Sequence, residues 1–141
     1  MKKSEKAAEL FKKGFNCSQA IIGAFCEDYG IKMQTGLKIA SGLGSGVRSA
    51  EICGAVSGAV LVIGLKYGSD NTDSKTLCNT KTEEFIKMFR EINGSIVCRD
   101  ILGCDITTPH GKEKALAEQY FTTVCLDMVV SAAQILEDLY Y

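Results

Sequence analysis

The sequence predicts an all-α protein, a single-domain helical bundle of five to seven helices over residues 1–141. The chain contains one proline and few runs in which apolar and polar residues alternate, so little in it favours β-strands. Several apolar stripes instead follow helical spacing and end at a glycine. No composition shift, internal repeat or low-complexity segment divides the chain, which predicts one domain.

Each expected helix begins near a capping residue and ends near a glycine or another turn signal. The start of the second helix is the most specific, because Asn16 followed by Gln19 forms a capping box. Ser49 is expected to be the N-cap residue of the fourth helix, as Asn16 is of the second. The expected ranges are 4–13, 16–29, 35–41, 50–67, 73–93 and 112–139, with a short helix or turn over 95–103.

Composition and charge exclude several functional classes. The chain is 46% hydrophobic and 23% charged with a net charge of −1, as in ordinary globular proteins, and no basic face predicts nucleic-acid binding. The charged, amphipathic N-terminus does not resemble a secretory signal. The longest uncharged apolar run, residues 52–65, has about 14 residues, fewer than the about 20 that span a bilayer. We therefore expect a cytoplasmic protein without a membrane partner.

Seven cysteines are the main chemical feature of the chain. An odd number in a reducing compartment argues against a permanent disulfide framework, which leaves metal or cluster ligation, redox chemistry or burial. No CxxC motif is present, so neither a thioredoxin-type pair nor a zinc ribbon is favoured. Because free cysteine often behaves as a small buried hydrophobe, we assign Cys26 and Cys78 to the core. For Cys104, burial and an auxiliary role are equally supported.

Two cysteines lie at expected helix starts. Cys17 follows the Asn16 cap, and Cys53 lies about one turn inside the helix that Ser49 is expected to cap, with Arg48 nearby. The positive end of a helix dipole favours a thiolate, so we expect the pKa of both thiols to be lowered.

The remaining candidates are better explained by structure than by chemistry. Gly54 and Gly58 form a GxxxG motif that permits close helix packing. The glycine-rich turn at 42–46 follows no strand and has no Walker lysine, so a tight reversal is favoured over a phosphate site. His110, the only histidine, is expected to be a solvated loop residue. The terminal pair 140–141, two tyrosines, is consistent with packing in a homodimer or with a frayed end.

Five ordered motifs cover nearly the whole chain: FNCSQA at 15–20, CGAVSG at 53–58, GLKYG at 64–68, IVCRD at 96–100 and VC at 124–125. Together they resemble the C_GCAxxG_C_C family of redox-active proteins. One difference is that the family label places glycine before cysteine, whereas Cys53 precedes Gly54 here.

The resemblance implies redox chemistry and a set of four recurring cysteines, which correspond here to Cys17, Cys53, Cys98 and Cys125. A similar domain occurs in split-Soret cytochromes, which adds iron–sulfur binding as an expectation, although this chain has no CxxCH motif for haem attachment.

Four cysteines on four segments suit one convergent site inside a bundle. Such a site can hold a [2Fe–2S] or [4Fe–4S] cluster and, in principle, zinc. Without metal, two close sulfurs can form a reversible disulfide. Three functions therefore remain open: electron transfer with a redox partner protein through a cluster, a metal-free thiol–disulfide oxidoreductase or thiol sensor, and a structural or zinc-binding module. The sequence does not decide whether the protein is an enzyme.

Overall fold

The computed structural model describes residues 1–141 and confirms the all-α class. It has eight α-helices, one more than the upper limit of the predicted range, and a 3-10 helix over Cys26–Tyr29. The α-helices are α1 (Lys3–Lys12), α2 (Cys17–Phe25), α3 (Met33–Ile39), α4 (Gly54–Tyr67), α5 (Lys75–Asn93), α6 (Cys98–Leu102), α7 (Pro109–Ala117) and α8 (Val124–Asp138). None of them is long and apolar enough to cross a membrane.

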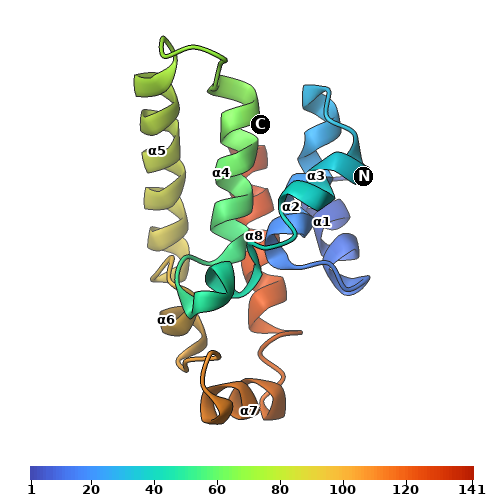
Figure 1. The fold of residues 1–141 in the computed structure, drawn as a ribbon, viewed down its shortest axis with the longest axis vertical. Coiled ribbons are helices and arrows are strands. Elements are labelled where there is room, and N and C mark those ends of the chain that lie inside the picture. The colour runs from blue at the N-terminus through green and yellow to red at the C-terminus, as the bar shows by residue number, and fades with distance from the viewer.

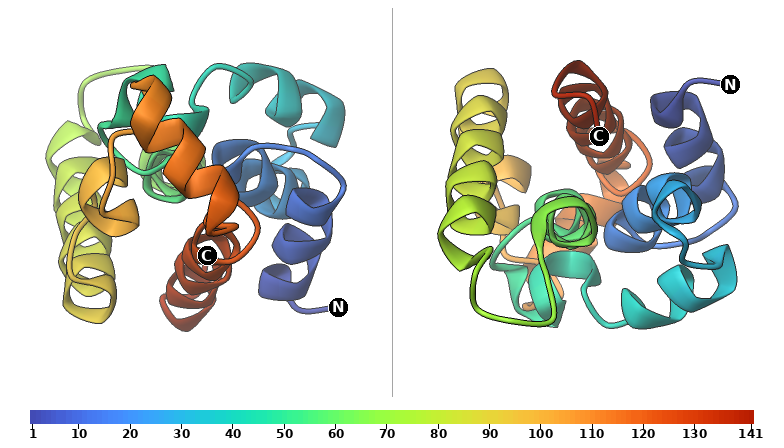
Figure 2. Two further views of the ribbon diagram at one scale, coloured as in Figure 1. Left: turned by 90° about the horizontal axis from the view of Figure 1, so that it is seen from below. Right: turned by 90° about the horizontal axis from the view of Figure 1, so that it is seen from above.

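Helix α4 is central in the bundle, where it packs against α2, α5 and α8, while α1 packs against α2 and α8 (Figure 1). Helices α2, α4 and α8 all begin at the end of the bundle that carries α6 and α7. Viewed along the bundle, α7 crosses this end (Figure 2). The N-termini of three core helices therefore meet beneath a cap formed by the α6–α7 region.

The predicted capping box at the start of α2 is confirmed. The side chain of Asn16 accepts a hydrogen bond from the backbone N–H of Gln19 at 2.8 Å, and the backbone N–H of Asn16 donates to the Gln19 side chain at 3.0 Å. The Asn16 side-chain amide also donates to the carbonyl of Ser41 at 3.0 Å. The same residue thus begins α2 and holds the turn that follows α3.

The predicted start of the fourth helix at Ala50, capped by Ser49, is wrong. Ser45, Gly46, Val47 and Arg48 have φ values of 54°, 63°, 58° and 56°, which make one left-handed turn in place of an α-helix. This region costs non-glycine residues about 1–2 kcal/mol each. Helix α4 begins only at Gly54, so Cys53 is its N-cap residue and does not lie within its first turn.

The single long helix predicted over 112–139 is also wrong, because the structure divides it into α7 and α8. The break occurs at Gln119, which adopts a positive φ of 59°. The N–H of Tyr120 bonds to the carbonyl of Ala115 and that of Gln119 to Leu116, which is the Schellman pattern of a helix end. Residue types other than glycine rarely end helices in this way, so the sequence carried no signal for the break.

The chain ends in a packed rather than frayed conformation. The ring of Tyr141 meets that of Tyr67 edge to face, with centroids 5.7 Å apart. Lys66 donates a hydrogen bond to the Tyr140 carbonyl at 2.7 Å. Tyr141 therefore closes the far end of α8 against α4 within the same chain.

Candidate functional site

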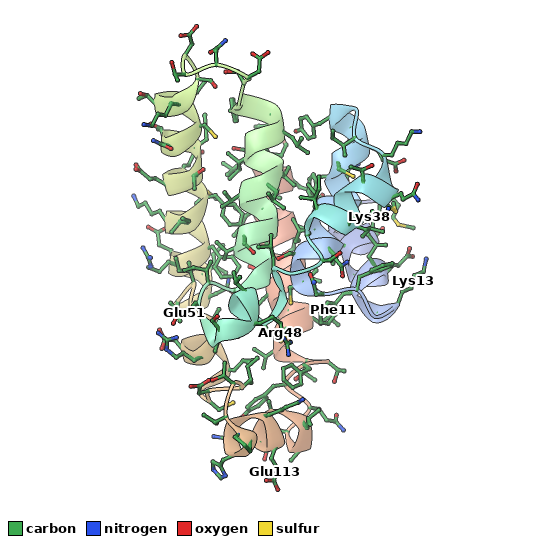
Figure 3. All side chains as sticks on the ribbon, in the orientation of Figure 1. Phe11, Lys13, Lys38, Arg48, Glu51 and Glu113 are labelled. Atoms are coloured by element: carbon green, nitrogen blue, oxygen red, sulfur yellow. The ribbon has the colours of Figure 1, made fainter.

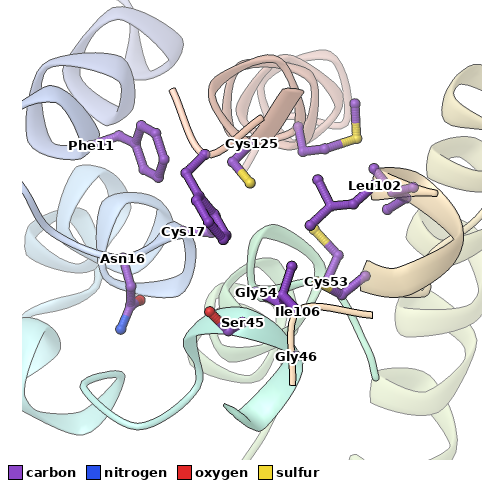
Figure 4. Close-up of a pocket in the computed structure, with 14 residues that line it drawn as sticks. Phe11, Asn16, Cys17, Ser45, Gly46, Cys53, Gly54, Leu102, Ile106 and Cys125 are labelled. Carbon is purple, nitrogen blue, oxygen red and sulfur yellow. The ribbon is translucent and has the colours of Figure 1, made fainter. Parts of the chain in front are cut away.

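Four of the seven cysteines line one cavity of about 200 Å³ at the end of the bundle where α2, α4 and α8 begin: Cys17, Cys53, Cys98 and Cys125. Figure 4 shows Cys17, Cys53 and Cys125 around this space. The other walls are mainly apolar and include Phe11, Ile101, Leu102, Ile106, Phe121 and Met128. We call this space the cysteine cavity.

All four cysteines lie at the beginning of a helix. Cys17 is the first residue of α2 and Cys98 the first residue of α6, Cys53 directly precedes α4, and Cys125 is the second residue of α8. The positive ends of the helix dipoles of α2, α4 and α8 therefore point toward the cavity, where they favour negative charge.

Close packing of α2 on α4 positions Cys17 beside Cys53. The Ser18 hydroxyl, fully buried, donates to the carbonyl of Gly54 at 2.6 Å and contacts the Ser57 hydroxyl at 2.9 Å. A β-carbon at Gly54 would lie 3.1 Å from the β-carbon of Cys17. The GxxxG motif thus acts in packing, as expected, and the packing places two thiols at one end of the interface.

A single antiparallel β-bridge positions Cys98 beside Cys53. It pairs Ile52 with Val97, the residues that immediately precede the two cysteines. The Cys53 N–H donates to the carbonyl of Ile96 at 2.8 Å, and the Cys98 N–H donates to that of Glu51. Glu51 also forms an ion pair with Arg99 at 2.8 Å. This bridge joins segments more than 40 residues apart, and no sequence pattern marked it.

The thiols of Cys17 and Cys125 lie close enough to shift each other's pKa. Their hydrogen bond, together with burial, raises the pKa of Cys17 well above its ordinary value and lowers the pKa of Cys125 despite the burial of that thiol. Cys125 is therefore the member of this pair that ionises first. The expectation of a lowered pKa at Cys17 is wrong, because the neighbouring thiol and desolvation outweigh the helix dipole.

Burial is also the main cause of the pKa shifts of Cys53 and Cys98, which are 6% and 8% exposed. It raises the pKa of Cys53 to about 11, although the backbone N–H groups of Ala55 and Val56 favour the thiolate. It raises the pKa of Cys98 to about 12, with a further contribution from Cys53. The lowered pKa expected for Cys53 is therefore also wrong.

These raised pKa values predict an alkaline loss of stability in the reduced, metal-free protein. From about pH 9 to about pH 11 the folded state holds the Cys53 proton while the unfolded state releases it, so stability is full below this window and falls as the pH rises. The expected slope is about 1.4 kcal/mol per pH unit for each such thiol.

Urea unfolding between pH 8 and pH 11 under anaerobic reducing conditions measures this slope. A Cys53→Ala, Cys98→Ala variant serves as the comparison, because Tyr141, whose pKa burial also raises, titrates in both proteins. As the pH rises, the stability of the variant is expected to fall less steeply than that of the unmodified protein. An equal slope in the two proteins would contradict the raised pKa values of Cys53 and Cys98.

The other three cysteines lie outside the cysteine cavity. Cys26 is completely buried in the core, and Cys78 packs against that core from α5. Cys104 is half-buried in the loop after α6, close enough to Cys98 to raise the pKa of that thiol. His110 is exposed in the first turn of α7. No three His, Cys, Asp or Glu side chains lie close enough together to hold a single metal ion.

A family model described as "Putative redox-active protein (C_GCAxxG_C_C)" matches residues 15–139, a range that includes all four cysteines of the cavity. No curated protein and no solved structure matches the chain.

Proposed function

The chain belongs to the C_GCAxxG_C_C family of redox-active proteins, and we propose that it transfers electrons through an iron–sulfur cluster held by Cys17, Cys53, Cys98 and Cys125. One observation carries the proposal: four cysteines from four helix starts line the same apolar cavity.

The donor set supports a cluster more than a single metal ion. Four cysteine thiolates are the ligands of [2Fe–2S] and [4Fe–4S] clusters, and such a cluster supplies one-electron transfer. A structural zinc site instead requires four donors grouped tightly around one ion. The four thiols here surround a cavity of about 200 Å³, and no three of them are grouped for a single ion.

The surroundings of the thiols suit a centre with negative charge. Helices α2, α4 and α8 direct their positive ends at the cavity, and the backbone N–H groups of Ala55 and Val56 favour the Cys53 thiolate. The apolar walls limit access of water, which favours electron exchange with a redox partner protein over side reactions with solvent. Because burial keeps Cys53 and Cys98 protonated in the metal-free protein, iron uptake must displace their protons.

Anaerobic reconstitution with iron and sulfide, followed by analysis of both elements, tests the proposal. We expect iron and acid-labile sulfide in equal amounts, a broad visible absorption and reversible bleaching by a one-electron reductant. A reconstituted protein that holds neither iron nor sulfide would overturn the cluster assignment.

The mutual pKa shifts of Cys17 and Cys125 favour a second candidate function, a metal-free thiol–disulfide oxidoreductase or thiol sensor. Exchange with a disulfide of a partner molecule would form one S–S bond between Cys17 and Cys125 and break the partner's S–S bond, which is reduced to two thiols. Cys125, which ionises first, would be the attacking thiolate.

Alkylation rates test this candidate through a specific expectation. In reduced, metal-free protein at pH 7.5, Cys125 is expected to react with iodoacetamide faster than the other three cavity cysteines, because its pKa is lowered. A Cys17→Ala substitution removes the neighbouring thiol and should slow the alkylation of Cys125 about tenfold, because a hydrogen bond to a thiolate contributes about 1.5 kcal/mol.

Cys78→Ala provides the control, since Cys78 lies on α5 outside the cavity and should leave the Cys125 rate unchanged. A Cys17 thiol that reacts faster than Cys125, or a Cys125 rate that is unaffected by Cys17→Ala, would contradict the assignment of the reactive thiolate.

A further inference from the structure

A second pocket, of about 260 Å³, adjoins the cysteine cavity. It is lined by Ser45, Arg48, Ile106, Thr107 and Lys112, and two of these residues, Ser45 and Ile106, also line the cysteine cavity. The two spaces therefore share a wall. We call the second space the basic pocket.

The basic pocket is lined by two cations and by no carboxylate. Neither Arg48 nor Lys112 belongs to any of the ion pairs in the structure. Of the acidic residues in the adjoining segments, Asp105 stays charged beside the pocket through its bonds to Thr107, and Glu51 is neutralised by an ion pair. Asp105 accepts from the backbone N–H of Thr107 at 2.9 Å, and Glu51 is paired with Arg99. An anion in the pocket would meet two cations without competition from a lining carboxylate.

The left-handed turn positions one of these cations. Ser45 and Arg48 begin and end the run of positive φ values, and the guanidinium of Arg48 donates to the Ser45 hydroxyl at 3.2 Å. Figure 3 shows Arg48 extending from this turn toward the region of α6 and α7. Lys112 approaches from the first turns of α7. Backbone strain of this kind is typical of segments that hold a functional group in place.

We propose that the basic pocket binds the phosphate-type oxyanion of a small molecule. Arg48 can donate two parallel hydrogen bonds to such a group, Lys112 adds a point charge, and the Ser45 hydroxyl can donate its own proton. Because Ser45 and Ile106 line both spaces, a molecule bound in the basic pocket lies next to the cysteine cavity. Oxyanion binding does not depend on whether the cysteines hold a cluster.

Titration of the isolated full-length protein with inorganic phosphate at constant ionic strength tests the binding. Amide chemical shifts of residues 45–48 and 106–112 are expected to change saturably. Arg48→Gln and Lys112→Gln should each weaken binding about tenfold, Arg48→Lys less, and Lys114→Gln, an exposed lysine of the same helix, not at all. Equal affinities in all these proteins, or shifts confined to other regions, would overturn the proposal.

A second measurement tests whether charge in the basic pocket affects the reaction of charged reagents with Cys125 in the cysteine cavity. In the reduced full-length chain, the ratio of the iodoacetate to the iodoacetamide rate at Cys125 should fall severalfold in Arg48→Gln and on addition of phosphate, but not in Lys114→Gln. Both reagents react with the same thiolate of Cys125, so a change in the pKa of this thiol cancels in the ratio of the two rates. A ratio unaffected by both Arg48→Gln and phosphate would contradict the predicted connection.

Discussion

Replacing any one of Cys17, Cys53, Cys98 or Cys125 with serine is expected to abolish or severely reduce iron and sulfide content after reconstitution. Each residue supplies one of four thiolate ligands, and the harder hydroxyl oxygen of serine is a poor substitute for a thiolate on iron–sulfur clusters. The visible absorption of the reconstituted protein measures the loss, and circular dichroism checks that each variant is folded.

Cys78→Ser and Cys104→Ser are the matched controls, because both side chains are half-buried and lie outside the cysteine cavity. Both variants are expected to keep the full cluster content. If Cys104→Ser lost the cluster while one of the four cavity variants retained it, Cys104 would be a ligand and the proposed set would be wrong.

Gly58→Ala is expected to destabilise the protein and to disrupt the cysteine site together. A β-carbon at this position would lie 2.9 Å from both the α-carbon and the carbonyl oxygen of Ser18, and 3.0 Å from the β-carbon of Ile21. Because two of these atoms belong to the backbone of α2, the helix must move away from α4. Such overpacking costs about 1–3 kcal/mol, and here it also separates Cys17 from Cys53.

Gly64→Ala on the same helix is the control for this prediction. No atom lies within 4 Å of a β-carbon at Gly64, so alanine should stabilise α4 by up to about 1 kcal/mol and leave cluster content unchanged. Chemical unfolding and iron analysis of the two variants give both readouts. A Gly58→Ala protein as stable as the Gly64→Ala protein would show that close α2–α4 packing is not required.

The parts of the fold that could be predicted depend on local signals. The Asn16–Gln19 capping box marked the start of α2 because a cap is a property of a few neighbouring residues. The GxxxG motif of Gly54 and Gly58 indicated a close helix neighbour for the same reason, although it did not identify α2 as that neighbour.

The errors occur where ordinary residues adopt left-handed conformations. Val47 and Arg48 do so before α4, and Gln119 does so between α7 and α8. Intrinsic preferences argue against this conformation at all three positions, so tertiary contacts must impose it. The ion pair of Glu51 with Arg99 and the Ile52–Val97 bridge hold the first of these segments.

The position of Cys98 beside Cys53 could not be derived from residue patterns. It results from one β-bridge between distant segments, and neither segment has the alternating pattern of a strand. The resemblance to the family singled out Cys98 and Cys125, whereas helix-start reasoning singled out only Cys17 and Cys53. In the structure all four residues lie at helix starts, but only the start of α2 was predicted correctly from the sequence.

The most direct test of the proposed cluster is a comparison of alkylation at all seven cysteines before and after anaerobic loading with iron and sulfide, followed by mass spectrometry. We predict that loading protects Cys17, Cys53, Cys98 and Cys125 together, while the reactivity of Cys78 and Cys104 is unchanged. Protection of only Cys17 and Cys125, present without iron and removed by a disulfide reductant, would contradict the cluster and establish the dithiol instead.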